Sequence, residues 1–403
     1  MDEGPHTALE ANSIRTSRYL AVSVLTTVTA FLPVFLVGAL AVELRQSLHF
    51  DSGRLGLAVS FYYLGAGVGS MPLSWITERI GGSRMMRIAT AAGAILTALL
   101  ATATSSWDTL ASILGLCGVV GGAILPATYA FLARHARIDR QGLTFGINQA
   151  AVPLASLLGG VAVPSLALTL GWRWTFASAA VLSLITCFLI PSSNSSPKRT
   201  TRTRHADKGR RLTVAPLVLL SVGLGLGMFA ANAVVAFLAV ASVAVGFGKG
   251  AAGLVVAAGA SAAAVVRIGA GIQADRRGKR HFPVVAAMLA VGAAGYVVLA
   301  AGSMTHSRWL FLGAAVVALG AGWGWNGLFI FAVVRTHSRF PARAIGIVDV
   351  GGRLGGVLGP LTVGLVIVHA SYATAWIVAA AAAATASGAV LLGRHRLTAS
   401  HPT

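Results

Sequence analysis

The amino-acid sequence predicts an all-α membrane protein with twelve transmembrane helices in two pseudo-symmetric six-helix bundles. Three observations support this prediction: the composition, the long apolar segments, and the distribution of basic residues among the loops. Of the 403 residues, 56% are hydrophobic and only 10% are charged. Soluble globular proteins have about 25% charged residues, so this chain has too little polar surface for water and suits a lipid bilayer.

Long apolar segments recur along the whole chain. A helix needs about 20 apolar residues to cross a bilayer. The segments that meet this length are 19–42, 55–77, 88–104, 110–132, 143–170, 172–190, 214–240, 251–274, 282–304, 309–334, 344–369 and 372–392. The first is too long for the apolar core of a signal peptide, so we expect an uncleaved helix.

Basic residues alternate between the loops on the two sides of the predicted membrane span. The loops that share a side with both termini hold 24 of the 31 Lys and Arg residues, and the opposite loops hold 5. The positive-inside rule therefore predicts a multi-pass protein of the cell (inner) membrane with both termini cytoplasmic. This topology also accounts for the net charge of +20, so we expect no nucleic-acid partner.

The polar stretch between the sixth and seventh segments divides the chain into three parts. Its Ser, Pro and basic residues suit a flexible linker. The predicted parts are an N-terminal six-helix bundle (1–190), a cytoplasmic basic linker (191–213) and a C-terminal six-helix bundle (214–403).

The two predicted bundles are similar to each other in sequence. A shift of 200 positions places Gly146 on Gly346 and Gly159 on Gly359, and it also places Gly122 of the fourth segment on a glycine of the tenth. Two parallel six-helix repeats predict a central cavity between them.

Three motifs resemble those of one transporter family. Residues 271–280 (GIQADRRGKR) resemble the G-x-L-A-D-R-x-G-R-R signature of the major facilitator superfamily. Residues 74–84 (SWITERIGGSR) form a degenerate copy of it in the first half, and 171–176 (GWRWTF) resembles the family's junction between helices 5 and 6. The resemblance implies a monomeric transporter of small molecules that has no cofactor and is not an enzyme.

The signature motif also implies a gate. An acidic side chain at a helix end can pair with an arginine and with a neighbouring helix N-terminus. Such a contact can form in one conformer and break in another. By resemblance, the gating residues are Asp275 and Arg276 in the second half, Glu78 and Arg79 in the first, with Asp349 as a further coupling candidate.

Strongly polar residues lie inside only some of the predicted helices. They are Asn148, Gln149, Asn232, Arg267, Asn326, Asp349 and Arg353. The third, sixth, ninth and twelfth segments carry none, and the resemblance implies that these four are peripheral. A charge at the bilayer centre costs about 2.5–3.5 kcal/mol on insertion scales, so each needs a partner or a water-filled cavity.

The two deep arginines favour an anionic substrate. A guanidinium group binds a carboxylate through two parallel hydrogen bonds. Arg267, four residues before the signature motif, resembles a position in monocarboxylate and oxalate–formate carriers, and residues 351–360 resemble helix 11 of aromatic-acid symporters. The structural alternatives are an internal Asp349–Arg353 ion pair at i,i+4 spacing and a gating role for Arg267.

The uncharged candidates have structural alternatives as well. The side chains of Asn148, Gln149, Asn232 and Asn326 could contact substrate or form hydrogen bonds between helices. Tyr129 could stack on an aromatic ligand or pack at an interface. The only deep carboxylate is Asp349, so a proton remains open as the coupling ion, beside exchange and facilitated diffusion.

The leading hypothesis is transport of a small organic anion, such as a carboxylate, by alternating access. The alternative is export of hydrophobic drugs or natural products, which glycine-rich helices around an apolar cavity would allow. A third hypothesis is a membrane receptor without net flux. No nucleotide-binding loop, metal-ligand cluster or nucleophile motif is present in the sequence,.

Overall fold

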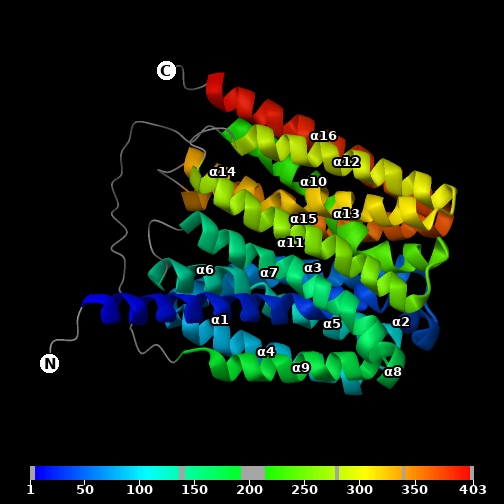
Figure 1. Cartoon of the computed structure of the whole chain (residues 1–403), viewed down its shortest axis with the longest axis horizontal. Helices are drawn as coiled ribbons and strands as arrows, with labels where there is room; N and C mark the ends of the chain where they lie inside the picture. The colour runs from blue at the N-terminus through cyan, green and yellow to red at the C-terminus, as the bar shows by residue number, and fades with distance from the viewer. Residues whose placement is uncertain (1–4, 136–140, 192–213, 277–280, 338–340, 400–403) are drawn as a thin grey trace.

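The computed structural model describes residues 5–135, 141–191, 214–276, 281–337 and 341–399. All its regular elements are helices, which confirms the predicted all-α class. Most helices run side by side along one axis, and the start of α1 and the end of α16 lie at the same end of the bundle (Figure 1). We call that end the terminal side and the opposite end the distal side.

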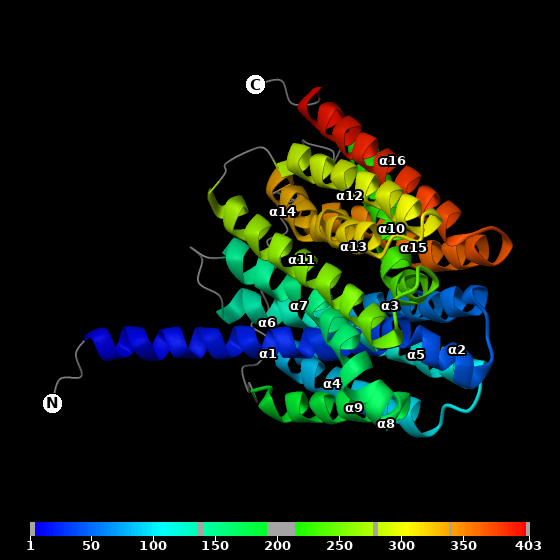
Figure 2. The same cartoon turned by 45° about the vertical axis from the view of Figure 1, so that its right-hand side comes forward.

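The helices fall into two groups, one above the other in Figures 1 and 2. The first group consists of α1 Pro5–Ala39, α2 Ala41–Leu48, α3 Ser52–Ile80, α4 Gly82–Thr102, α5 Trp107–Gly121, α6 Ile124–His135, α7 Gln141–Ala162, the π-helical turn η2 Val163–Ala167, α8 Leu168–Leu170 and α9 Trp172–Leu189. The second consists of α10 Val214–Ala244, α11 Lys249–Arg276, α12 His281–Met304, α13 Arg308–Gly324, α14 Asn326–Thr336, α15 Pro341–His369 and α16 Tyr372–Ala399. All but the first residue of the predicted linker, 191–213, lies outside the described residues.

The predicted twelve-helix architecture is confirmed. Eleven stretches of the described chain are long and apolar enough to cross a membrane. The remaining predicted segment, 55–77, forms the 29-residue helix α3. Tyr62, Tyr63 and several Ser and Gly residues lower the hydropathy of α3. These residues suit a helix that packs against α5 and α15.

Several predicted helices are interrupted or differ in their bounds. The expected helix 19–42 is wrong at both ends, because α1 begins at Pro5 and the helix breaks at Leu40 before α2. The polar first turns of α1 precede its apolar span, so hydropathy could not detect them. The fourth predicted helix breaks at Gly122 and the tenth at Trp325. The two breaks occupy similar places in the two halves, as expected for repeats.

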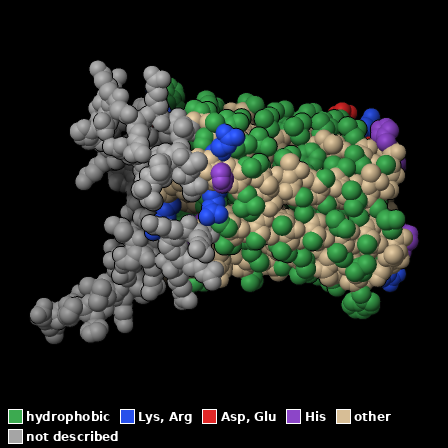
Figure 3. Space-filling view, turned by 90° about the horizontal axis from the view of Figure 1, so that it is seen from above, with side chains coloured by type: hydrophobic (Ala, Val, Ile, Leu, Met, Phe, Trp, Pro, Cys, Tyr) green, Lys and Arg blue, Asp and Glu red, His purple; other side chains and the backbone are tan. Residues whose placement is uncertain are grey.

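The surface is that of a membrane-embedded bundle. Apolar side chains cover the middle of the face shown in Figure 3, and charged and histidine side chains gather toward its ends. Large apolar side chains are exposed on α4, α9, α12 and α16, for example Ile95, Phe188, Val291 and Leu392. These are the third, sixth, ninth and twelfth spans, and they lie at the two outer edges of the bundle, as the resemblance implies (Figures 1 and 2).

Glycines bring the two halves into close contact on the distal side. Helix α3 lies against α15, and α7 lies against α11. A methyl group at Gly56 would overlap the carbonyl oxygen of Pro360, and one at Gly160 would overlap that of Gly253. Small residues allow backbones in a membrane to pack at this distance, so the distal ends of these helix pairs are tightly closed.

We predict that Gly56→Ala lowers the stability of the protein by about 1–3 kcal/mol, because the added methyl group would force two backbones apart,. The matched control is Gly93→Ala in α4, where nothing lies within 4 Å of the added atom. Thermal unfolding of both variants in detergent measures the difference. Equal melting temperatures for the two variants would contradict the close distal contact.

Candidate substrate site

Arg267 lies at the contact between the two halves. Its side chain extends from α11 and is only 2% exposed. Nη1 donates a hydrogen bond to the carbonyl oxygen of Gln149 on α7 at 2.8 Å, and Nη2 donates to that of Trp323 on α13 at 3.0 Å. The guanidinium carbon also lies 5.2 Å from the centre of the Trp323 ring. Arg267 therefore joins the second half to the first.

The positive charge of Arg267 has no negative partner among the described residues. The ion pair between described side chains is Asp349–Arg353, which leaves Arg267 without a carboxylate. Its Nε atom is buried and has no hydrogen-bond acceptor. A buried charge without a counter-charge is unfavourable, so the position is suited to a negatively charged group.

Polar side chains from four helices surround this arginine. The hydroxyl of Tyr63 on α3 donates to Oδ1 of Asn232 on α10 at 2.9 Å. Nε2 of Gln149 donates to the hydroxyl of Tyr129. Both tyrosines lie near Arg267, and Nδ2 of Asn232 is buried without an acceptor. Four predicted site residues, Arg267, Gln149, Asn232 and Tyr129, thus belong to one cluster, which we call the central cluster.

Asn148 and Asn326 have other surroundings. Oδ1 of Asn148 accepts a hydrogen bond of 2.9 Å from the hydroxyl of Ser23 on α1. Neighbouring residues on a helix point in directions about 100° apart, so Asn148 contacts α1 while Gln149 contacts Tyr129. Asn326 is the half-buried first residue of α14. For Asn148, the structure therefore shows the interhelical hydrogen bond that was the alternative to a substrate contact.

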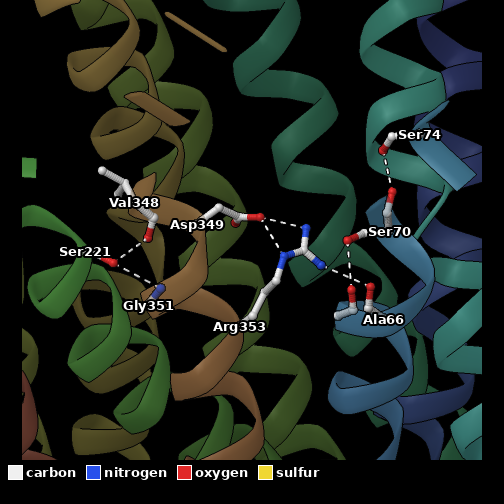
Figure 4. A network of polar contacts seen from close by, with 9 residues as sticks. Ala66, Ser70, Ser74, Ser221, Val348, Asp349, Gly351 and Arg353 are labelled. Atoms are coloured by element: carbon white, nitrogen blue, oxygen red, sulfur yellow. Dashed lines mark hydrogen bonds and ion pairs between the residues drawn. The ribbon is translucent and has the colours of Figure 1, made fainter. Parts of the chain in front are cut away.

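Arg353 and Asp349 form the ion pair that their spacing allows. Nη2 and Nε of Arg353 lie 2.6 and 2.8 Å from Oδ2 of Asp349. Nη1 donates to the carbonyl oxygen of Ala66 on α3 at 3.0 Å. The two charged side chains are 38% and 39% exposed. Figure 4 shows Arg353 reaching from α15 toward α3, on which Ala66 and Ser70 lie.

The two arginines make the same kind of contact at both interfaces between the halves. Arg267 bonds from α11 to the backbone of α7, and Arg353 bonds from α15 to the backbone of α3. Each guanidinium comes from the second half, and each acceptor is a carbonyl oxygen of the first. Movement of the halves would break both bonds.

The predicted gating residues lie at the terminal ends of α3 and α11. Glu78 and Arg79 are exposed, and the guanidinium of Arg79 lies 3.4 Å from the centre of the Trp75 ring. Within the described part of the chain, Glu78 has no ion pair. The side chains of Asp275 and Arg276 are not among those that the structure describes. The gate formed by these residues with Glu78 and Arg79 therefore stays a prediction.

A separate cavity of about 250 Å³ lies within the second half, between α11, α12 and α14. Apolar side chains form most of its wall, including Val266, Val284, Met288 and Leu328. Gln273 and His281 are its polar members, and Nε2 of His281 is buried without a partner. The residues of the central cluster do not line this cavity.

A twelve-helix bundle with two similar halves that meet around buried polar residues is the architecture of a secondary transporter. Residues 23–339 match the family model of the Major Facilitator Superfamily. The chain therefore belongs to this superfamily, and it is a membrane transporter rather than an enzyme.

Two solved structures share the fold. A D-xylose–proton symporter matches with a TM-score of 0.76 and 15% identity over 93% of this chain and 96% of its own. A bacterial homologue of the human lysosomal transporter Spinster, in an inward-facing and occupied conformation, matches with a TM-score of 0.70 and 14% identity over 94% and 97%. No curated protein matches the sequence of this chain.

Sequence reasoning overlooked several members of the polar networks. The strongly polar residues of the sequence do not include Ser23 and Tyr63, whose hydroxyls form hydrogen bonds to other helices. The carbonyl acceptors of Gln149 and Ala66 could not be found from side-chain type. The glycines around Ala66 give one usable signal, because they mark a backbone that neighbouring groups can approach closely.

We predict that Tyr63→Phe destabilises the protein by about 0.5–2 kcal/mol, because it removes the hydrogen bond to Asn232 between the halves,. The matched control is Tyr296→Phe, which removes a buried hydroxyl that has no partner. The control should change stability by less than about 0.5 kcal/mol. Equilibrium unfolding in detergent compares them, and an equal effect would argue against the bond across the interface.

Proposed function

We propose that the protein transports a small organic anion, with a carboxylate as the recognised group, by alternating access. The observation that carries this proposal is the buried guanidinium of Arg267, which has no carboxylate partner among the described residues. A carboxylate substrate would supply the missing counter-charge, and pairing would offset the unfavourable burial of both charges.

The hydrogen-bonding capacity of the central cluster also supports an anion. Nε of Arg267 and Nδ2 of Asn232 are buried donors without acceptors. An ionised carboxylate accepts hydrogen bonds and donates none. A ligand rich in acceptor oxygens would therefore accept hydrogen bonds from both groups. An ammonium ligand, which only donates, would accept from neither.

The contacts between the halves support a conformer that is open on the terminal side. On the distal side, Gly56 and Gly160 bring opposing backbones together. Toward the terminal side, Asp349 and Arg353 are about two-fifths exposed although they lie within a membrane span. Charged groups at that depth require water. An aqueous path from the terminal side toward the central cluster follows from this proposal.

The remaining parts of the proposal come from the sequence. The excess of basic residues in the terminal-side loops supports cytoplasmic termini in the cell inner membrane,. In that topology the substrate path opens to the cytoplasm. The family resemblance implies that the protein acts as a monomer. Glu78 and Arg79, with Asp275 and Arg276, would close the path when the halves tilt.

Export of a hydrophobic compound is the second candidate function. The cavity between α11, α12 and α14 supports it, because Val266, Val284, Met288 and Leu328 would contact an apolar ligand. This cavity is separate from the central cluster, so the two candidates predict binding at different places and can be distinguished by substitution.

We predict that carboxylates raise the melting temperature of the purified protein, because a ligand bound by the native state stabilises it. The panel contains aliphatic and aromatic carboxylates, neutral sugars and lipophilic cations. Arg267→Gln should abolish the carboxylate shift, and Arg353→Gln should weaken it. Arg84→Gln, which removes an exposed charge from α4, is the matched control and should keep the shift.

Arg267→Lys keeps the positive charge but loses the two parallel N–H donors of the guanidinium group. We therefore expect carboxylates to raise the melting temperature of this variant by less than that of the wild type, but not to lose the effect. Each variant is first compared with the wild type without ligand, to separate loss of binding from loss of folding. A carboxylate shift that survives Arg267→Gln at full size would overturn the proposed site. A shift with neutral sugars alone would overturn the anionic substrate.

The second candidate predicts a different result. A lipophilic cation such as tetraphenylphosphonium would raise the melting temperature, and Ala270→Leu would remove this shift by filling the cavity. Arg267→Gln would leave it unchanged. No response to the lipophilic cation, together with a carboxylate shift that Ala270→Leu retains, would exclude the exporter.

A further inference from the structure

Glu43 is a half-buried acidic residue with buried carboxyl oxygens, and it has no role in the proposed transport cycle described above. It lies in the first turn of α2, the short helix that follows α1 on the distal side. Leu40, Ala41 and Leu44 beside it are fully buried. Both carboxyl oxygens of Glu43 are buried, and neither has a hydrogen-bond partner.

Glu43 lies at a contact between the halves. Helix α2 belongs to the first half and packs against α10 of the second. Three residues after Glu43, Oε1 of Gln46 accepts a hydrogen bond of 2.7 Å from Nζ of Lys249 at the start of α11. The contact therefore combines apolar packing with one hydrogen bond, and it would have to separate for the distal side to open.

The charged side chains near Glu43 form hydrogen bonds with residues other than Glu43. From α11, Lys249 bonds to Gln46. From α2 itself, Arg45 donates to the carbonyl oxygen of Phe50 at 3.2 Å. From α9, which contacts α2 through Trp172 and Ser47, Arg173 donates to the carbonyl oxygen of Thr104. The helix α10 carries no titratable side chain, and the span of α1 carries none near its distal end.

Burial raises the pKa of Glu43, and this effect exceeds the opposing influence of its own backbone amide and of Lys249. Burial disfavours the charged form of a carboxyl group because it removes water. The closed distal contact therefore raises the proton affinity of Glu43. When the halves separate, water would reach the group and stabilise its ionised form.

We propose that Glu43 is a proton-binding site of the distal gate, where protonation stabilises the closed gate and loss of the proton favours opening. This inference rests on the alternating-access part of the proposed function. Because the proton binds more tightly to the closed conformer, closure and proton uptake are linked reciprocally. The closed conformer loses this stabilisation as the pH rises through the raised pKa of Glu43.

The size of the effect follows from this linkage. If the proton affinity of Glu43 differs by one pKa unit between the closed and open conformers, the ratio of open to closed molecules changes by about tenfold across the transition. Acidification of the distal compartment would hold the gate closed. The transport rate would then respond to the pH on the side where the gate opens.

The test is a distance measurement across the distal gate that needs no substrate. Spin labels are attached at Ala103→Cys and Ala370→Cys, two exposed distal positions on opposite halves. Cys117 and Cys187 are replaced by Ala in the same protein. Pulsed electron–electron double resonance in lipid nanodiscs then measures the distance between the two labels at pH values from 4 to 9, in steps of about one unit. The measurement gives the fractions of molecules with the short and the long distance.

We predict that the long-distance fraction of the parent protein rises with pH and that Glu43→Gln keeps the short distance throughout, because Gln mimics the neutral carboxyl. The matched control is Asp108→Asn, which removes an exposed distal carboxylate and should retain the response of the parent. A full pH response in Glu43→Gln, or a parent that shows one distance at every pH, would overturn the proposal. Either result leaves the carboxylate shift and its loss in Arg267→Gln unaffected, so failure of the gate is distinguishable from failure of the substrate site.

Discussion

The structure depends on one unusual constraint, a positive charge buried where the two halves meet. Arg267 is surrounded by α7, α11 and α13, and backbone carbonyl oxygens provide its hydrogen bonds. Such bonds disperse the charge but do not neutralise it. In the central cluster, Nε of Arg267 and Nδ2 of Asn232 are buried donors without acceptors. Under the proposed function, an anionic ligand would accept hydrogen bonds from both.

The two interfaces between the halves combine close backbone packing with single polar hydrogen bonds. Glycines such as Gly56 and Gly160 allow extended backbone packing on the distal side. The arginine bonds of the centre each involve a single donor and acceptor, so small displacements can break them. Under the proposed alternating access, polar bonds of this kind would be exchanged for substrate contacts, whereas the glycines set how closely the distal ends can approach.

Much of the fold could be predicted because the bilayer imposes length and polarity on every helix. The apolar segments follow from this constraint. The peripheral position of α4, α9, α12 and α16 was implied by the family resemblance, and the repeat of the two halves by matching residues at a shift of 200 positions. The spacing of Asp349 and Arg353 likewise anticipated their ion pair, because i,i+4 residues are neighbours on any helix,. Helix ends were less predictable, since the polar turns of α1 continue beyond the membrane span.

The sequence by itself therefore determined the class of protein, the number of helices and the polar residues available to a site. The tertiary structure decided which of these residues meet. Gln149 joins Arg267 while its neighbour Asn148 contacts α1, because the helix turns them toward different partners. The structure also decided the surroundings of Glu43. Its helix, α2, packs against α10, which is distant in the chain, and the environment of a carboxyl group is a property of packing rather than of sequence order,.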